Sequence, residues 1–272
     1  MMVKKLYITG ALFCFILMSG CNKSVSVDAL PPAVNPPGTP NSSLKISYGD
    51  TILYLKAGSS NIIVPQPMNK PGQFSGFPDG IEIDNTTGAI NIAMSESGLR
   101  YKIMFVPTGT TDTISTKIVI SGINFYDKIY RLSAGDSIAR PIYNANGQSY
   151  SPGLFGTGFT NSFDDDKGCN NQGCAVSLNN GSINLAQSIR NGAILSINDA
   201  QKEFTYYYRM DDNSQKTLNQ LKVKLYYYNT YADIPQYLWD IILIEHAGTI
   251  LRSSGTQKAA KPRPPCVIII AN

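Results

Sequence analysis

Histidine, tryptophan and charge are scarce in this sequence. One histidine and one tryptophan occur among 272 residues, and 15% of the residues are charged. A metal site built from several histidines is therefore excluded, and a catalytic dyad or triad has a single candidate base. The formal net charge of +4 is too small to indicate a nucleic-acid partner. The hydrophobic content of 43% is typical of a globular chain and excludes a disordered one.

Long hydrophobic runs are also missing, apart from one near the N-terminus. Lys4 and Lys5 precede the apolar run 6–18, and Ser-Gly-Cys follows at 19–21. An apolar core of about a dozen residues is too short for a membrane span and has the proportions of a secretory signal. The segment resembles a bacterial lipoprotein signal with its lipobox at 18–21, except that methionine stands where leucine is usual. A secretory signal with a coincidental cysteine is the alternative.

The lipoprotein resemblance implies how the chain is processed and anchored. Residues 1–20 would be removed as a signal peptide, and Cys21 would carry the acyl chains that bind membrane lipid. Asn22 favours the outer membrane, because enteric-type sorting retains lipoproteins in the inner membrane chiefly when aspartate stands there. The periplasmic and the surface-exposed side both stay open. Residues 21–43 contain five prolines and are expected to form an extended linker.

Short β-branched and aromatic runs alternate with Gly, Pro, Asn and Asp from residue 44 onward, at a spacing of about ten residues. This pattern is typical of an all-β sandwich. The predicted strands are 47–55, 61–64, 81–84, 89–93, 100–106, 113–120, 130–132, 137–142, 182–186, 203–209, 222–228, 237–245 and 267–270.

An internal repeat divides this region. Residues 55–58 (LKAG) and 88–92 (GAINI) recur in the same order as 132–135 (LSAG) and 181–185 (GSINL). Chance similarity of two short stretches is the alternative to a duplication. The expected domains are 44–124 and 125–272, the second with an inserted cysteine loop and extra C-terminal strands.

The stretch 78–90 contains Pro-Asp-Gly-Ile-Glu-Ile-Asp followed by Thr-Gly-Ala-Ile. It resembles the signature of the putative-Ig, cadherin-like repeats of bacterial surface proteins, of which the second half keeps only Asn-Gly-Ser-Ile at 180–183. The glycines suit turns that need positive φ, and the isoleucines suit a core face. The resemblance implies two tandem immunoglobulin-like β-sandwiches that serve as spacers or binding modules and not as catalysts.

No nucleophile elbow, phosphate loop or zinc-protease motif occurs in the sequence. We therefore expect a protein without enzymatic activity. A cryptic hydrolase that uses two sequence-distant carboxylates is the alternative.

The acidic stretch 164–168 (DDDKG) is a candidate cation site, with Asp164 and Asp166 as possible oxygen ligands of Ca²⁺. Lys167 stands where a ligand or neutral residue would be usual, and no bidentate glutamate follows at the expected spacing. An acidic loop in contact with solvent is the alternative, so no cofactor is required.

Tyrosine is abundant in the second half, which contains three consecutive tyrosines at 206–208 and again at 226–228. If these are adjacent antiparallel strands, the middle tyrosine of each faces away from its neighbours, and one face can be an aromatic platform for sugar rings. Tyrosines that fill the core are the alternative. The candidate ligand-binding residues are Tyr207, Tyr227, Tyr231 and Trp239.

The cysteines predict one short disulfide. An exported chain folds in an oxidising compartment, and four residues separate Cys169 from Cys174. We expect these two to pair and Cys266 to stay a buried thiol; pairing of Cys266 with either of them is the rival.

Two function classes follow from the sequence. The first is a non-enzymatic outer-membrane or surface lipoprotein whose domains bind a ligand or partner such as a glycan, by analogy with the auxiliary surface lipoproteins of glycan-uptake systems. The second is a structural or assembly lipoprotein that contacts other envelope proteins. An aromatic cluster beside a groove would favour the first, and a broad apolar patch without a groove the second.

Overall fold

The computed structural model describes residues 45–66, 70–146, 160–247 and 264–271. The signal peptide 1–20, Cys21 and the linker 21–43 lie outside the described residues. Most regular elements are strands, so the predicted all-β class is confirmed. None of the helices in the described ranges has the length and apolarity that a bilayer crossing requires.

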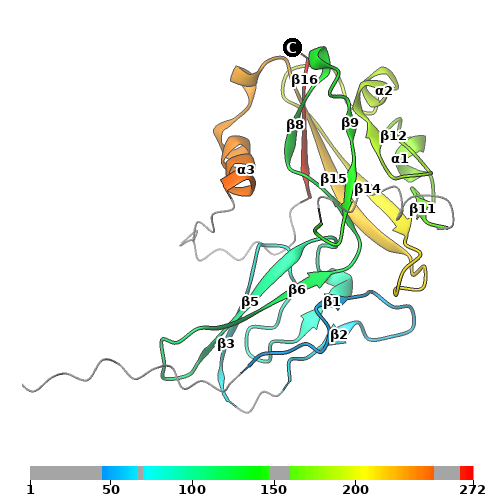
Figure 1. The fold of residues 1–272 in the computed structure, drawn as a ribbon. Helices are drawn as coiled ribbons and strands as arrows, with labels where there is room; N and C mark the ends of the chain where they lie inside the picture. The colour runs from blue at the N-terminus through cyan, green and yellow to red at the C-terminus, as the bar shows by residue number, and fades with distance from the viewer. Residues whose placement is uncertain (1–44, 67–69, 147–159, 248–263, 272) are drawn as a thin grey trace, which may run out of the picture. The chain divides into compact units, whose positions relative to one another are not determined.

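The first lobe, residues 45–122, contains two small sheets (Figure 1). Its four-stranded sheet has the order β1-β6-β5-β3, in which β1 is parallel to β6 and the other pairs are antiparallel. The second sheet is the antiparallel pair β2-β4. The strands are β1 (Ile52–Leu53), β2 (Ile62–Ile63), β3 (Gly72–Phe77), β4 (Ile90–Asn91), β5 (Arg100–Pro107) and β6 (Ile114–Ile120), with a 3₁₀ turn, η1 (Ile92–Met94), after β4.

Strand β5 shows how the sequence pattern builds this lobe. Tyr101, Ile103 and Phe105 are fully buried, while Lys102 and Met104 between them are half-exposed. The alternation of polar and apolar residues, which predicts one buried and one wet face, is thus confirmed for this strand. The buried side chains join a cluster drawn only from the first lobe.

The putative-Ig-like stretch forms a tight turn that places one glycine against an aromatic ring. The carboxylate of Asp84 accepts hydrogen bonds from the amides of Thr86 (2.9 Å) and Thr87 (2.7 Å). Gly88 follows with φ +72°, and a Cβ there would lie 2.6 Å from the ring of Phe74. Glycine is therefore required twice over, by backbone conformation and by space.

The second lobe, residues 123–271, is organised around a five-stranded sheet with the order β11-β14-β15-β16-β8. β16 is parallel to both of its neighbours, and the other pairs are antiparallel. A three-stranded sheet, β12-β13-β9, and the pair β10-β7 complete it. The strands are β7 (Ile123–Phe125), β8 (Lys128–Arg131), β9 (Ile138–Ala139), β10 (Pro141–Tyr143), β11 (Ser162–Phe163), β12 (Ala175–Val176), β13 (Ile183–Asn184), β14 (Ala200–Arg209), β15 (Asn219–Tyr228) and β16 (Cys266–Ile270).

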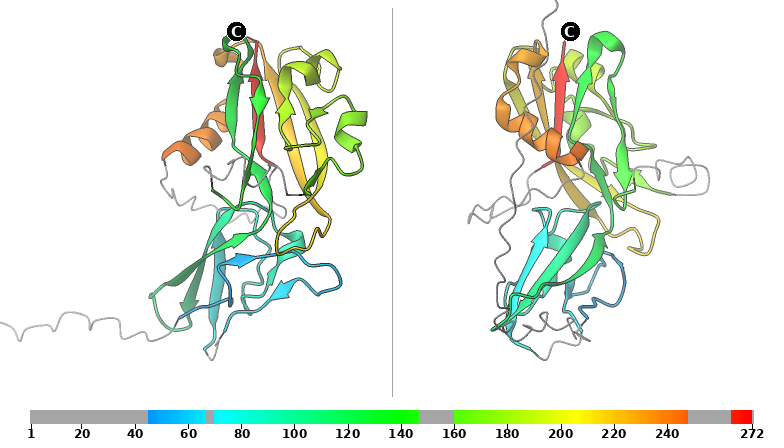
Figure 2. Two further views of the ribbon diagram at one scale, coloured as in Figure 1. Left: turned by 45° about the vertical axis from the view of Figure 1, so that its right-hand side comes forward. Right: turned by 60° about the vertical axis from the view of Figure 1, so that its left-hand side comes forward.

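Helices cover both faces of the five-stranded sheet (Figures 1 and 2). One face packs on the three-stranded sheet and on α1 (Gly168–Asn171) and α2 (Leu185–Arg190) in a large buried cluster. The other face packs on α3 (Gln236–Ala247) in a separate cluster. The remaining elements are the 3₁₀ turns η2 (Leu132–Ala134) and η3 (Tyr231–Asp233). Both faces of the five-stranded sheet are therefore covered, whereas each sheet of an antiparallel sandwich leaves its outer face in contact with solvent.

The strand predicted at 237–245 is wrong, because this segment is helix α3. Its apolar run includes three isoleucines, and a buried helix and a buried strand of this length share the same composition. The signals for a helix lie just before it. Thr230 and Asp233 form a reciprocal capping box around η3, and Pro235 precedes the first residue of α3.

The two repeat landmarks occupy matching places in the two lobes. Asn91 and Asn184 end β4 and β13, and the side chain of each accepts a hydrogen bond from the amide three residues later. Gly181, like Gly88, has positive φ and faces a phenylalanine ring, with its Cβ position 2.7 Å from Phe163. The buried clusters divide between Ile120 and Ile123, near the predicted boundary of the domains 44–124 and 125–272.

Candidate ligand-binding site

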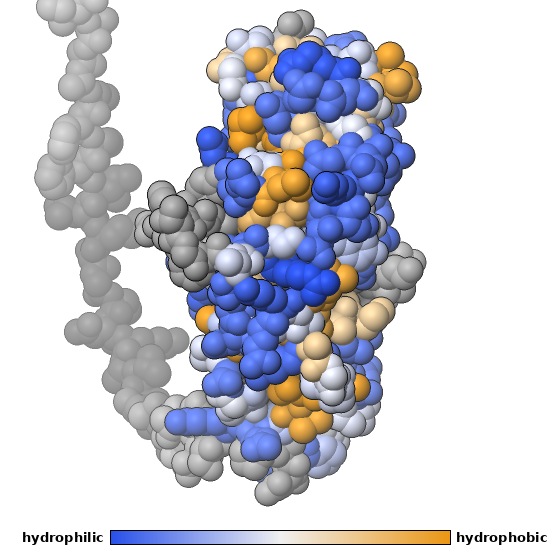
Figure 3. Space-filling model, turned by 90° about the vertical axis from the view of Figure 1, so that its right-hand side faces the viewer, coloured by the Kyte–Doolittle hydropathy of each residue, from blue (hydrophilic) through white to orange (hydrophobic). Residues whose placement is uncertain are grey.

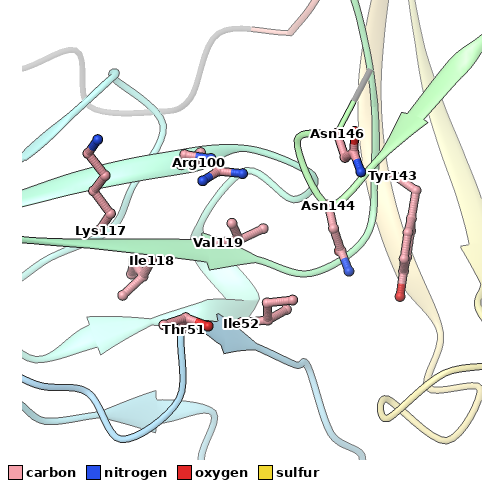
Figure 4. Close-up of a pocket in the computed structure, with 9 residues that line it drawn as sticks. All are labelled: Thr51, Ile52, Arg100, Lys117, Ile118, Val119, Tyr143, Asn144 and Asn146. Atoms are coloured by element: carbon pink, nitrogen blue, oxygen red, sulfur yellow. The ribbon is translucent and has the colours of Figure 1, made fainter. Parts of the chain in front are cut away.

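A hollow of about 540 Å³ opens beside the edge where β1 pairs with β6. Figure 4 shows its lining side chains, with Arg100 and Lys117 toward one side and three residues from the end of β10 toward the other. The complete lining is Thr51, Ile52, Arg100, Lys117, Ile118, Val119, Tyr143, Asn144 and Asn146. The hollow therefore combines residues of both lobes.

The strand register concentrates positive charge at this hollow. Arg100 lies opposite Val119, and Lys102 lies directly opposite Lys117, so all three cations share one face of the β5-β6 pair. Within the described ranges, none of the three forms an ion pair, and Arg100 and Lys117 are exposed. Like charges directly opposite each other repel, so this face gains from a bound anion.

The opposite wall of the hollow is fixed by hydrogen bonds. Asn144 and Ala145 both have positive φ and form a tight turn after β10. The side-chain oxygen of Asn144 accepts from the amide of Gly122 at 3.0 Å, which leaves its NH₂ group as a donor without a partner among the described residues. The hydroxyl of Tyr143 donates to the carboxylate of Asp212 at 2.6 Å; burial, and after it this bond, raises the pKa of Tyr143. Tyr143 is therefore a neutral, hydrogen-bonded part of the wall.

A second hollow of about 500 Å³ adjoins the first, and Thr51 and Ile52 line both. Its other lining residues are Asp50, Tyr54, Lys56, Asp212, Asn213 and Gln215. The carboxylate of Asp212 is already occupied, since Tyr143, Ser121 (3.3 Å) and the amide of Ser214 (2.7 Å) all donate to it. The first hollow presents the cations Arg100 and Lys117 and the amide of Asn144, which suit a polar ligand with at least one negative charge, whereas the second hollow also presents the carboxylate of Asp50.

The predicted tyrosine platform is not formed as expected. β14 and β15 are adjacent and antiparallel, but Tyr207 pairs with Gln220 and Tyr227 with Ala200, at opposite ends of the pair. Tyr227 is buried in the cluster beneath α1 and α2, whereas Tyr207 is half-exposed on the face that α3 covers elsewhere. The register thus places the two middle tyrosines on opposite faces of the sheet, and the platform prediction for this pair is wrong.

The other two predicted residues do meet. The rings of Tyr231 and Trp239 stack with centroids 6.1 Å apart and an angle of 24°. Tyr231 is 45% exposed, and Trp239 packs its other side against the cluster under α3. Leu243, one helical turn after Trp239 and on the same side of α3, is also exposed. Tyr237 is exposed as well, but it lies about 160° around the helix from Trp239. We call Tyr231, Trp239 and Leu243 the α3 surface.

The acidic loop uses its carboxylates within the chain. Asp164 is buried, and its two carboxylate oxygens accept hydrogen bonds from the amide of Cys169 and from the amide and side chain of Asn170. Asp166 accepts from the amide of Gly168 at 2.9 Å. Among the described residues, no three potential metal ligands gather at one place. The geometry therefore assigns Asp164 to capping the short helix α1.

The predicted disulfide is not formed in the structure. Cys169 and Cys174 are both buried thiols, and the thiol of Cys169 donates to the backbone oxygen of Thr205 at 3.3 Å. Burial raises the pKa of Cys174 to about 12, so this group is a thiol and not a thiolate at neutral pH. Cys266 is also buried and takes no part in a disulfide. The two neighbouring cysteines therefore act as core side chains.

Sequence reasoning missed the cationic hollow entirely. Arg100, Lys102 and Lys117 carry no recognisable motif, and they meet only through the register of two strands joined by a long turn. The alternation in β5 shows that Arg100 and Lys102 share the wet face, but nothing in the sequence identifies the residue opposite them.

No family model and no curated protein matches the chain. Among solved structures, two crystal structures of the EC1-2 fragment of human protocadherin-24 are similar, at 12% and 11% identity. Each alignment covers 67% of this chain, and 95% and 94% of the respective fragments. The TM-scores are 0.23 and 0.22, so the fold described above depends on the sheets of this chain alone.

Proposed function

We propose that the protein is a non-enzymatic lipoprotein of the bacterial outer membrane that binds an anionic ligand, an acidic glycan, in the cationic hollow. The observation that carries the proposal is the face shared by Arg100, Lys102 and Lys117, which have no ion pair among the described residues. Carboxylate or sulfate groups on a sugar would relieve this repulsion. The amide group of Asn144 supplies a donor suited to a sugar hydroxyl.

The test is a glycan-array screen of the fragment from Ser42, followed by titration of any bound acidic oligosaccharide. Replacing Arg100 or Lys117 with glutamine should each cost about 1 kcal/mol, or about fivefold in affinity. The loss should shrink at high salt, because exposed charges are screened. Lys70→Gln is the matched control, since Lys70 is exposed and does not line the hollow. Binding of neutral glycans only, unaffected by Arg100→Gln, would contradict the proposal.

Membrane attachment through Cys21 is the second part of the proposal, and the sequence at 18–21 supports it. Cys21→Ser should move the protein from the membrane fraction to the soluble fraction, because three acyl chains are lost. The matched control is Cys14→Ser, inside the apolar run, which should leave fractionation unchanged. A Cys21→Ser protein that stays with membranes would rule out lipid anchoring.

The α3 surface supports a second candidate function, contact with another envelope protein. It exposes Tyr231 (45%) and Leu243 (56%), and Trp239, whose ring stacks on that of Tyr231, lies one helical turn before Leu243. By contrast, the face of the molecule in Figure 3 shows hydrophobic residues in small patches separated by hydrophilic ones. Tyr231→Ala and Leu243→Ser should abolish capture of a protein partner and leave glycan binding intact. The reverse result would assign the α3 surface to the glycan.

A further inference from the structure

The main sheets of the two lobes have the same order of strands except at one place. In the first lobe β1 pairs directly with β6, as Ile52 with Val119. LSAG follows β8 as LKAG follows β1, and Asn184 matches Asn91. With these landmarks aligned, β8 corresponds to β1 and β15 corresponds to β6. β8 and β15 do not pair with each other, because β16 lies between them (Figure 1). β16 therefore fills a groove that the first lobe does not have.

β16 is bound to this groove along its whole length and on both faces. Its residues pair in register with 224–228 of β15 and with 128–131 of β8. Val267 and Ile269 enter the cluster beneath α1 and α2, and Cys266, Ile268 and Ile270 enter the cluster beneath α3. All five are at most 3% exposed. An empty groove would expose two apolar clusters and two strand edges, so it needs an occupant.

The connection to β16 differs from those of the other long strands. A strand parallel to both neighbours is reached by a crossover and not by a hairpin, so no tight turn ties it to β15. In sequence, residues 248–263 separate the end of α3 from the residues that lead into β16. The pairing of β16 with β8 and β15, and its burial in the two clusters, would be the same if the strand came from another copy of the chain.

We propose that residues 264–271 of one copy occupy the groove between β8 and β15 of a second copy, which gives strand-exchanged assemblies. The exchanged and the closed forms make the same sheet contacts, so concentration decides between them. The chain's own strand has an effective concentration in the millimolar range for a connection of this length. Chains concentrated on a surface would therefore favour exchange.

A disulfide across the β15-β16 pair tests this, because Lys224 lies directly opposite Cys266. The acceptor chain carries Lys224→Cys and Cys266→Ser, and the donor chain is otherwise natural with Cys266. Both full chains are unfolded together, refolded and oxidised, and the cross-linked peptide that joins positions 224 and 266 is quantified by mass spectrometry. If the strands exchange, this peptide forms. The fraction of chains cross-linked between copies should then rise about tenfold for a tenfold rise in protein concentration below the millimolar range.

Two controls make the result decisive. A single chain with Lys224→Cys and natural Cys266 should form the bond within itself, which shows that the variant folds with this register. A donor with Cys266→Ser should give no cross-linked peptide. If the single chain cross-links and the mixed chains do not, even at millimolar concentration, the proposal is overturned. Failure of the single chain to cross-link overturns it as well, because the register on which it depends is then wrong.

Discussion

The hydroxyl oxygens of Tyr208 and Ser97 lie 2.7 Å apart and join the two lobes through a buried hydrogen bond. Ser97 donates to the backbone oxygen of Ile123 at 3.1 Å, so Tyr208 is the donor to Ser97. The oxygen of Tyr208 in turn accepts from the amide of Ile123 at 3.3 Å. Both the backbone oxygen and the amide of Ile123, the first residue of the second lobe, are thus hydrogen-bonded to this pair of hydroxyls.

Removing this link should destabilise the protein and couple the two positions. Tyr208→Phe leaves the amide of Ile123 without its acceptor and should cost about 1–2 kcal/mol in the free energy of unfolding. In a double-mutant cycle with Ser97→Ala, we expect a coupling of about 1 kcal/mol. Tyr206→Phe is the control, because the hydroxyl of Tyr206 donates to the backbone oxygen of Gly181 within the second lobe. Its effect should add to that of Ser97→Ala without coupling. Additive effects of Tyr208→Phe and Ser97→Ala would show that the bond is not made in solution.

At Gly88, the cost of crowding by Phe74 can be measured separately from the cost of positive φ. Gly88→Ala meets both positive φ and the ring of Phe74, and should cost about 2–4 kcal/mol. Gly58 has φ +73° with open space around its Cβ position, so Gly58→Ala should cost about 1 kcal/mol. Urea midpoints of the two variants measure the difference. Equal midpoints would mean that Phe74 moves away freely.

The tyrosines at 227 and 231 should respond in opposite ways to alanine. Tyr227 is 7% exposed within the largest cluster, so Tyr227→Ala should destabilise the fold by about 3–5 kcal/mol. Tyr231→Ala removes an exposed ring that stacks on Trp239, and should cost less than about 1 kcal/mol. Thermal unfolding of both variants distinguishes a core side chain from a surface one. A stable Tyr227→Ala protein would contradict the assignment to the core.

The buried thiols should make stability depend on alkaline pH. Burial holds the pKa of Cys174 at about 12 in the folded chain, above about 8.5 for an exposed thiol. Because the unfolded chain loses this proton first, stability is fully present below about pH 8.5 and falls as pH rises toward 12. Cys174→Ala should flatten the decline measured by urea unfolding between pH 8.5 and 10. In the native protein, alkylating reagents should label Cys174 only upon unfolding.

The first lobe has its own buried cluster and its own complete set of strands. A fragment of residues 44–122 should therefore unfold cooperatively in urea. The fragment loses the contact of Ser97 with Tyr208, so we expect it to be less stable than the lobe within the whole chain. A fragment without a cooperative transition would place the domain boundary elsewhere.

Local features of the fold could be predicted, and long-range ones could not. The glycine turns at 88 and 181 and the alternation in β5 depend on neighbours in sequence, and the structure contains them as expected. Helix α3 was missed because an apolar run without alternation fits either a helix or a strand. The position of β16 depends on pairing with residues about 40 and 140 positions away, which no local pattern encodes.

The candidate site shows the same division. Tyr231 and Trp239, eight positions apart, were both named as candidate binding residues, and a short turn and one helical segment bring their rings into contact. Tyr207 and Tyr227 were wrongly paired, because the turn between β14 and β15 sets a register that the two tyrosine runs do not share.

The position of β16 also sets the order in which the two sheets can form during synthesis. A chain emerges with its N-terminus first, so every strand of the first lobe is present once residue 120 has appeared. The sheet of the second lobe has a gap between β8 and β15 until residue 270 has appeared. During that interval the two apolar surfaces that β16 covers are exposed, and a chaperone that prevents aggregation has one defined groove, rather than the whole domain, to protect.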